Sequence, residues 1–461
     1  MDRLRKLWEP SEQRYEPISS PAPTDDSESE PSSPLSPKKP PFSWIDYTIF
    51  LLLGVAMLWA WNMFLAAGPY FQKRFVSSVW ISDNFQAAEV SVSTVANLGS
   101  MWVLTKMQEG ASYPKRIIVS LGINMVVFLL LALSTSVFGN VGAEGYFGFL
   151  LVMILATSLA TGLCQNGIFA YVAGFAGARY TQGIMTGQAI AGVLPCIAQI
   201  VSVLSVQAGR DDEPTGDESG GPPSAAPPVR PAAALAYFLT ATVIAVVTLF
   251  AFFLLLARHR RPAKSTEIAD SDGTEANNSE PRKEVPLMTL ARKLFWLAAA
   301  VFLTFAITMI FPVFTQRITS VRPADEQPPI LQPSSFIPLA FLFWNTGDLL
   351  GRMLTAVPSL SLVHRPRLVF ALSISRVVFI GLYHLCNIRG QGAVVESDFF
   401  YLVVVQGLFG LTNGFLGSTC MIGAGEWVGE EEREAAGGFM GLCLVGGLAV
   451  GSLASFFAAG S

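Results

Sequence analysis

FIPLAFLFWNTGDLLGRMLTAV, residues 336–357, has the length and apolar character of a membrane-spanning helix, yet it contains an acid and a base. About twenty apolar residues cross the hydrocarbon core of a bilayer. Asp348 and Arg352 lie one helical turn apart in this stretch, and each costs about 2.5–3.5 kcal/mol to insert. Phe341 and Asn345 fall on the same stripe of such a helix. We therefore predict that the stripe lines a bundle interior or a water-filled path, which makes it the first candidate site.

The composition extends this interpretation to the whole chain. Of 461 residues, 51% are hydrophobic and 14% are charged, whereas a soluble domain has about 25% charged residues. We therefore predict an all-α polytopic membrane protein. The net charge of −4 is small and gives no sign of nucleic-acid binding. The cysteines show neither the spacing of a disulfide framework nor that of a metal site, so we expect buried free thiols and no metal.

Apolar runs of about twenty residues recur along the chain after a polar start. Residues 1–41 are rich in Pro, Ser and acidic residues, and we predict a disordered tail because such a segment cannot bury enough apolar surface to fold. From there on we predict eleven transmembrane helices. Their ranges are 45–67, 85–107, 117–138, 147–173, 181–206, 232–257, 294–315, 335–357, 368–388, 398–422 and 436–458.

Lys and Arg are concentrated in alternate loops, which predicts the orientation in the membrane. With the N-terminus in the cytoplasm, most of these residues lie inside, and an odd number of spans places the C-terminus outside. Residues 207–231 then form an external loop and residues 258–293 a cytoplasmic linker. The linker separates a six-helix lobe, 42–257, from a five-helix lobe, 294–461. Two-lobed transporters are commonly organised in this way.

Several polar residues lie inside the predicted spans. Trp61 is consistent equally with an interfacial anchor and with a flat shelf for a heterocycle. Gln165 stands in a Gly-rich helix and is the amide that we select as a candidate ligand residue. We interpret the other amides in the spans as links between helices. Arg376 has three open interpretations: it bonds to carbonyls, it extends to an interface, or it pairs with Asp348 in place of Arg352.

Six short motifs occur in order along the spans. They are Trp61-Asn62 in the first span, QNG (165–167) in the fourth, MTGQAIAG (185–192) in the fifth, WNTGDLLGR (344–352) in the eighth, TNGF (412–415) in the tenth and EAAG (434–437) before the eleventh. No single motif is decisive, but the ordered set resembles the equilibrative nucleoside transporters from about residue 45 to residue 458.

The resemblance implies a variant of the major facilitator architecture, with eleven spans divided six plus five. It also implies nucleosides as the cargo, with nucleobases as a further option. By the same resemblance Trp61 packs against the ligand and Gln165 bonds to the base. Asp348 and Arg352 then hold the ribose hydroxyls, with Asn345 supporting the pair. Adjacent hydroxyls suit this role because they donate to a carboxylate and accept from a guanidinium.

Two positions depart from the family pattern. Ala60 stands where the family has a proline before Trp-Asn, so the bend of the first helix does not carry over. Leu65 stands at the methionine position that follows, so inhibitor sensitivity does not carry over either.

Other functions stay open or are disfavoured on the residues. Proton coupling through Asp348 is open, although a salt bridge to Arg352 favours passive transport. A sugar or drug facilitator of the major facilitator type is the main alternative. A phosphate-binding loop of the G-x-x-x-x-G-K-[ST] type is absent from the sequence, so we expect no ATP drive and no cofactor. An aspartyl hydrolase needs two acids that meet, and Asp348 is the acid in mid-span, so we expect no enzyme. A role as a receptor or scaffold is also disfavoured.

We expect a lipid bilayer, a small nucleoside and, in the coupled alternative, protons as the partners of this chain. The sequence leaves the choice of membrane open between the plasma membrane and a vacuolar or lysosomal membrane.

Overall fold

The computed structural model describes residues 42–108, 110–138, 141–175, 178–211, 231–259 and 285–459. These residues form α-helices, one π-helical segment, short 3-10 turns and an isolated antiparallel bridge between Ile318 and Ile388. The predicted tail 1–41 lies outside the described residues, as do most of the predicted loop 207–231 and most of the predicted linker 258–293.

Helices before residue 260 make up what we call the first half. They are α2 (Trp44–Ala66), α3 (Gly68–Arg74), α4 (Val79–Lys106), α5 (Tyr113–Val137), α6 (Ala143–Ala173), α7 (Ala178–Asp211) and α8 (Pro231–Arg258).

Helices after residue 284 make up the second half. They are α9 (Leu287–Lys293), α10 (Phe295–Thr308), α11 (Phe311–Thr315), α12 (Pro333–Leu354), α13 (Pro366–Ser375), α14 (Val378–Tyr383), the π-helical η4 (Phe400–Gly407), α15 (Leu408–Gly423) and α16 (Arg433–Ala459). Five 3-10 turns lie in the connections of this half: η1 (Ala324–Glu326), η2 (Pro329–Leu331), η3 (Pro358–Leu360), η5 (Ala424–Glu426) and η6 (Glu430–Glu432).

The all-helical membrane fold is confirmed, but the predicted number of spans is not. Among the described residues, nine helical segments are long and apolar enough to cross a membrane. The other two predicted ranges, 85–107 and 335–357, correspond to α4 and α12, which are 28 and 22 residues long. Both helices carry charged side chains, such as Glu89 in α4 and Asp348 and Arg352 in α12, which lower their hydropathy, so length and hydropathy together do not count them.

Several predicted single spans are interrupted helices. The span 294–315 divides into α10 and α11, and the span 368–388 divides into α13 and α14 at Arg376. The span 398–422 begins with the π-helical η4 before continuing as α15. An apolar run shows that a segment crosses the membrane, but it does not show where the helical hydrogen bonds are interrupted.

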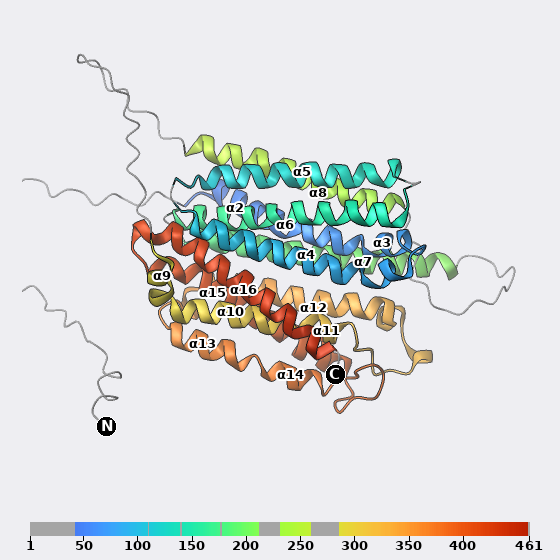
Figure 1. The fold of residues 1–461 in the computed structure, drawn as a ribbon. Helices are drawn as coiled ribbons and strands as arrows, with labels where there is room; N and C mark the ends of the chain where they lie inside the picture. The colour runs from blue at the N-terminus through green and yellow to red at the C-terminus, as the bar shows by residue number, and fades with distance from the viewer. Residues whose placement is uncertain are drawn as a thin grey trace, which may run out of the picture. The chain divides into compact units, whose positions relative to one another are not determined.

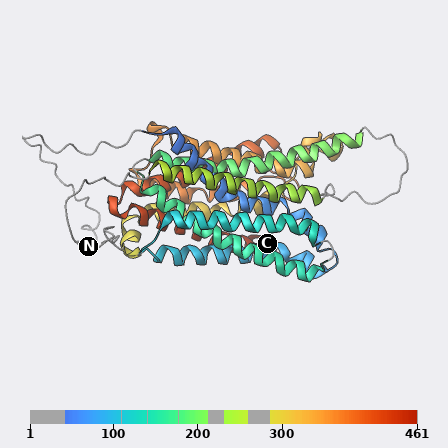
Figure 2. The same cartoon turned by 90° about the horizontal axis from the view of Figure 1, so that it is seen from above.

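The long helices run side by side along a common direction, as Figures 1 and 2 show. In the first half α2 packs on α7, α4 on α6 and α5 on α8, and in the second half α12 packs on α15 and α10 on α16. Across the halves, α7 contacts α12, and α16 contacts α6 and α4. The division into lobes at 42–257 and 294–461 stays a prediction.

We name the two ends of the bundle by the segments beside them. The linker end is where α8 ends and α9 begins, and α2 also begins there, since Arg258 Nε lies 3.1 Å from Asp46 Oδ1. The loop end is the opposite end, where α7 ends and α8 begins.

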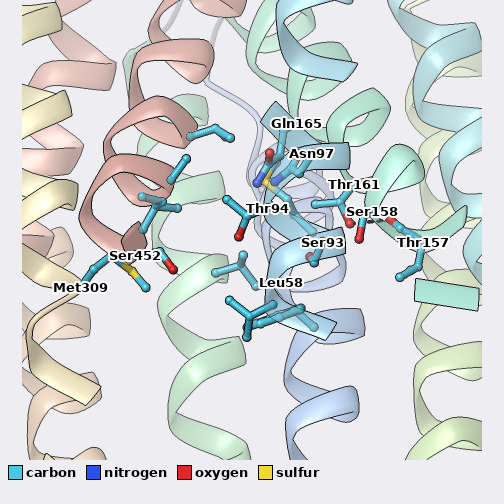
Figure 3. Close-up of a pocket in the computed structure, with 16 residues that line it drawn as sticks. Leu58, Ser93, Thr94, Asn97, Thr157, Ser158, Thr161, Gln165, Met309 and Ser452 are labelled. Atoms are coloured by element: carbon cyan, nitrogen blue, oxygen red, sulfur yellow. Dashed lines mark hydrogen bonds between the residues drawn. The ribbon is translucent and has the colours of Figure 1, made fainter. Parts of the chain in front are cut away.

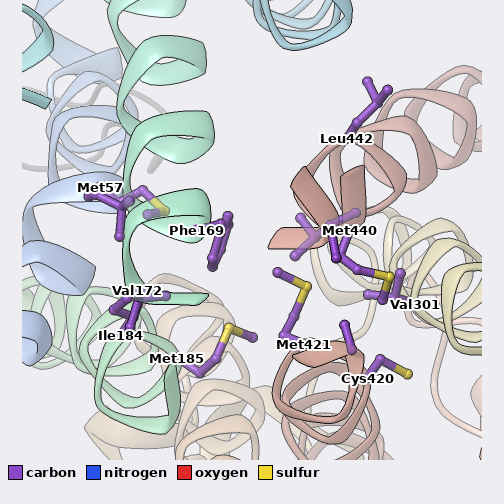
Figure 4. Packing of buried hydrophobic residues seen from close by; sticks show 14 of the residues in the cluster. Met57, Phe169, Val172, Ile184, Met185, Val301, Cys420, Met421, Met440 and Leu442 are labelled. Atoms are coloured by element: carbon purple, nitrogen blue, oxygen red, sulfur yellow. The ribbon is translucent and has the colours of Figure 1, made fainter. Parts of the chain in front are cut away.

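Three apolar clusters fill the bundle, and only one of them joins the halves. The seam cluster lies toward the linker end and combines Met57, Met101, Phe169 and Met185 of the first half with Val301, Cys420, Met421 and Met440 of the second. In Figure 4, Phe169 and Met185 face Met440 and Met421 across the seam. Toward the loop end each half has its own cluster, around Phe71 and Phe128 in the first half and around Phe336 and Tyr401 in the second.

Candidate functional site

A cavity of about 200 Å³ lies between the halves. Its lining comes from α2, α4, α6 and α16, together with Met309 next to α10. On each of these four helices the cavity residues follow the seam residues toward the loop end; on α16, for example, the seam cluster ends at Val445 and the cavity continues to Ser452. The cavity is therefore closed toward the linker end by the seam cluster.

Two of the predicted site residues line this cavity. Trp61 of α2 is half-buried, and Gln165 of α6 is only 4% exposed. The Oε1 atom of Gln165 is buried and accepts no hydrogen bond from the described residues. A buried amide oxygen without a donor is costly, at about 1–3 kcal/mol, so its presence beside a cavity indicates a place for a ligand.

The sequence interpretation missed most of the other polar residues of the cavity. Asn97 of α4 has a buried Oδ1 atom that also lacks a donor within the described part of the chain. Figure 3 shows Asn97 beside Gln165 at one end of the cavity. A further wall carries hydroxyl groups from Ser93, Thr94, Thr157, Ser158 and Thr161. Hydroxyl residues and single amides are common in membrane-spanning helices, so the sequence alone does not mark them as cavity residues. They are recognised as such only when the packing of α4 against α6 is known.

Asp348 and Arg352 form an ion pair within α12. Arg352 Nε donates to Asp348 Oδ2 over 2.7 Å, and the two residues are 4% and 3% exposed, respectively. Neither side chain lines the cavity described above. Their spacing of four residues along a helix explains the contact, as the sequence predicts.

Residues of two other helices complete the surroundings of this pair. Asn413 Nδ2 of α15 donates to Asp348 Oδ1 over 2.6 Å. Arg352 Nη1 donates to the Met185 carbonyl over 2.8 Å and to Gln188 Oε1 over 3.0 Å, both on α7. The pair thus connects the second half to the first. Gln188 Nε2 in turn lies 2.8 Å from the sulfur of Met57, which lines the cavity, so Met57 and Gln188 lie between the cavity and the pair.

Arg376 continues the polar chain on the far side of Asp348. Its guanidinium is 1% exposed and donates to the Thr304 carbonyl, to Thr308 Oγ1 over 3.0 Å and, with a weaker contact of 3.4 Å, to the Phe409 carbonyl. Thr308 Oγ1 donates to Asn413 Oδ1 over 2.7 Å, which links Arg376 to the amide that holds Asp348. Of the three interpretations of Arg376, bonding to carbonyls is therefore the one observed, since the buried side chain reaches no interface and Arg352 remains on Asp348.

The other two predicted residues of α12 do not line the cavity either. Asn345 Nδ2 donates to the Phe341 carbonyl over 2.9 Å, and Asn345 Oδ1 lies against Gly192 of α7. The Phe341 ring packs edge to face on Phe311 at 4.9 Å. The predicted stripe is thus divided: Asp348 and Arg352 form the polar chain, and Phe341 packs in the apolar second-half cluster.

Glycines set the position of Asp348 by letting two backbones touch. A Cβ atom at Gly414 of α15 would lie 1.9 Å from the Asp348 carbonyl oxygen, and one at Gly410 would lie 2.0 Å from the Trp344 carbonyl oxygen. On α12, a Cβ at Gly351 would lie 2.1 Å from the Leu411 carbonyl oxygen. No side chain fits at these positions, so α12 and α15 pack with their backbones in contact. This close packing places Asn413 within reach of Asp348.

Glu89 of α4 is buried, at 4% exposure, as are the acids Asp46 and Asp348. Its Oε1 atom has no hydrogen-bond partner in the described residues, and it lies one turn before Ser93 of the cavity wall. Within the described ranges, no three His, Cys, Asp or Glu side chains converge as metal ligands would. All five cysteines lie in these ranges and are free thiols, four of them buried.

Comparison with known proteins gives consistent relatives over most of the chain. A sequence model described as "Nucleoside transporter" matches residues 151–459. The yeast protein "Nucleoside transporter FUN26" from Saccharomyces cerevisiae is 30% identical over 447 residues, covering 89% of this chain and 83% of the relative. Human "Equilibrative nucleoside transporter 1" is 26% identical over 458 residues, covering 89% of this chain and 96% of the relative.

Two solved transporter structures share this fold, and one of them is described as a Major Facilitator Superfamily transporter. The transporter FucP in its outward conformation superposes with a TM-score of 0.54 at 16% identity, over 90% of this chain and 92% of the other. A bacterial homologue of the iron transporter ferroportin in an outward-facing state gives 0.54 at 11% identity, over 90% and 92% of the two chains. At such low identity the likeness shows the fold alone, and it confirms the predicted major-facilitator-like architecture.

Proposed function

This chain belongs to the nucleoside transporter family, and we propose that it carries nucleosides across a membrane by facilitated transport. The observation that carries this proposal is the cavity between the halves, where an aromatic ring and an unpaired buried amide lie together. Trp61 offers a stacking face and Gln165 a hydrogen-bonding edge, which together suit a flat base with a polar rim. Like its relatives, this chain is a transporter and not an enzyme.

We assign the ribose to Asp348 and Arg352. In this structure both Asp348 oxygens already have donors, and Arg352 is bonded to α7. Met57 and Gln188 lie between the pair and the cavity. Ribose hydroxyls can replace the contacts to Gln188 once Met57 and Gln188 move aside, because they both donate and accept. Asn345 and Phe341 support this pair indirectly, because their contacts help to position α12.

Transport by alternating access follows from the arrangement of the clusters. The seam cluster joins the halves toward the linker end, whereas toward the loop end each half is packed separately. We propose that the lobes 42–257 and 294–461 rock about the cavity, and that the loop end is open in this structure. With the N-terminus in the cytoplasm and the C-terminus outside, that end faces the exterior or the lumen. The plasma membrane and a vacuolar or lysosomal membrane are the two candidate locations.

Passive transport is favoured over proton coupling through Asp348. Its two oxygens already accept hydrogen bonds from Arg352 and Asn413. A sugar facilitator is the second candidate, since the hydroxyl wall on α4 and α6 could bond to sugar hydroxyls.

Radiolabelled uptake into proteoliposomes tests the function and the site together. We expect saturable uptake of adenosine or uridine that excess unlabelled nucleoside competes away and that hexose does not. Asp348→Ala should abolish uptake, whereas Asp83→Ala, which removes an exposed acid of α4, should leave it unchanged. An imposed pH gradient should not drive accumulation.

Three results would contradict parts of this proposal. Absence of nucleoside uptake by folded wild-type protein would exclude the cargo, and hexose uptake in its place would establish the sugar facilitator. Uptake that survives Asp348→Ala would move the ribose site elsewhere. Accumulation driven by a pH gradient would establish proton coupling.

A further inference from the structure

Two amide side chains stand apart from the other amides inside the bundle. The amide groups of Asn62, Asn124, Asn166, Gln188, Asn345, Gln406 and Asn413 each take part in a hydrogen bond within the protein. In the described part of the chain, the buried amide oxygens without a donor are Gln165 Oε1 and Asn97 Oδ1. Both residues line the same cavity, so a ligand bound against this part of its wall would lie beside both unsatisfied acceptors.

Asn97 of α4 packs against α6 within one turn of Gln165. A Cβ atom built at Gly162 of α6 would lie 3.3 Å from Asn97 Oδ1, so Asn97 lies against the turn that precedes Gln165. Figure 3 shows their side chains next to each other at one end of the cavity. Ser100 of α4 meets the same glycine, at 1.9 Å from the built Cβ, so glycine is required for this approach of α4 to α6.

The chemistry of two neighbouring amides defines the base that satisfies them. Each amide carries an NH2 donor beside its oxygen and therefore pairs with a base edge that has one donor and one acceptor. Adenine has two such edges, because its exocyclic amino group lies between the ring nitrogens N1 and N7. The two hydrogens of this amino group can each reach one of the unpaired oxygens. Asn and Gln form two-bond contacts of this kind with adenine in other settings.

Other common bases satisfy the pair less well. Hypoxanthine has a carbonyl oxygen in place of the amino group, so its single donor, N1–H, can reach only one of the two amide oxygens. Cytosine has one edge of the required type, and uracil has no exocyclic amino group. A site built to bond a donor rejects analogues that lack it, because the buried amide is left unpaired.

From this geometry we infer that Asn97 is a specificity-determining residue that, together with Gln165, selects nucleosides whose base carries an amino group with an acceptor ring nitrogen on each side, as adenine does with N1 and N7 and guanine does not, because its N1 carries a hydrogen. The inference rests on the proposed function, because it assigns the base end of the same cavity. Adenosine is the natural nucleoside with this pattern, so it is the preferred cargo.

Uptake selectivity tests the inference. Wild-type protein should take up adenosine with an efficiency about tenfold or more above that for inosine, the discrimination of a two-bond contact. Asn97→Leu, which keeps the branched arrangement of four side-chain heavy atoms and removes the amide, should reduce this preference by about tenfold. Asn84→Leu is the matched control, since this exposed amide of the same helix bonds to the Trp80 carbonyl away from the cavity, and it should keep the preference.

A ligand series makes the test independent of the folding of any variant. N6,N6-dimethyladenosine lacks both amino hydrogens and should compete at least tenfold less well than adenosine for uptake by the wild-type protein. Equal competition, or an adenosine preference unchanged in Asn97→Leu, would overturn the inference while leaving nucleoside transport intact. Failure of the wild-type protein to take up any nucleoside would instead overturn the proposed function.

Discussion

Asp348 belongs to a chain of polar contacts that runs from α7 to α13 through the apolar interior. It is held by Arg352 and Asn413, and Asn413 is held by Thr308, to which Arg376 also donates. Arg352 thus bonds to the carboxylate directly, whereas Arg376 is connected to it only through Thr308 and Asn413. Because every member depends on its neighbour, removing one leaves a buried partner unsatisfied.

The first prediction concerns Arg376, whose planar guanidinium bonds to atoms on several sides. Arg376→Lys should lower the free energy of unfolding by about 1–3 kcal/mol, because an ammonium cannot reach all of these acceptors. Thermal unfolding in detergent measures the change. Arg365→Lys, at an exposed position, is the control and should unfold like the wild type. Equal stability of both variants would show that the guanidinium contacts contribute nothing.

The second prediction concerns the contact of Asn413 with Asp348. A double-mutant cycle with Asp348→Ala and Asn413→Ala should give a coupling energy of about 1.5–3 kcal/mol in unfolding, as for hydrogen bonds to charged groups. Additive effects of the two substitutions would show that the 2.6 Å contact contributes no net stability.

For individual residues, the sequence predicts the ion pair of Asp348 and Arg352 but not the residues that surround it. The spacing of Asp348 and Arg352 on one helix is enough to predict their contact, which the structure has. Asn97 carries no such local signal, because its role depends on Gly162 of another helix. The bonds of Arg376 likewise go to residues of α10 and α15, far from it in the sequence.

At the scale of the helices, the main feature is the close packing of α12 on α15. Glycines on both helices put one backbone directly against the other, and the contact leaves no space for a methyl group. The sequence shows small residues at intervals in these spans, which predicts close packing of some kind. It does not show which helix is the partner, nor that α10–α11 and α13–α14 are interrupted, since those features depend on contacts between distant segments.

The third prediction follows from this packing. Gly414→Ala should destabilise the protein by about 1–3 kcal/mol and reduce uptake, because the added methyl group forces α15 away from the Asp348 backbone. Gly122→Ala of α5 is the control, since a Cβ there meets nothing within 4 Å and alanine favours the helix. Thermal unfolding and initial uptake rates measure both variants. A neutral Gly414→Ala would mean that α12 and α15 can separate without loss.

At the scale of the whole bundle, the main feature is the cavity between the halves and the seam cluster that closes it on one side. The cavity is closed toward the linker end by side chains from both halves, and the same end has another close backbone contact. A Cβ atom at Gly437 of α16 would lie 2.3 Å from the Phe169 carbonyl oxygen of α6. The two halves can close here only with glycine at this position.

The fourth prediction concerns a larger side chain placed at this contact. Gly437→Val should shift the equilibrium away from the state described here, and each 1.4 kcal/mol of strain changes the population tenfold. A cysteine placed at Ser452 in the cavity wall should then react more slowly with an impermeant maleimide added from the loop-end side. Gly99→Val, where a side chain meets open space, should leave the reaction rate unchanged. Unchanged labelling in Gly437→Val would show that this seam does not open during transport.

The apolar character of the seam cluster has a consequence for how the rate of transport depends on temperature. Separation of the halves at the linker end would expose methionine, phenylalanine and valine side chains to water, and hydration of apolar surface raises the heat capacity. If this opening limits turnover, the activation enthalpy itself changes with temperature, as it does when proteins fold and unfold. A plot of the logarithm of the uptake rate against reciprocal temperature should therefore be curved. A straight line would place the slow step away from the seam.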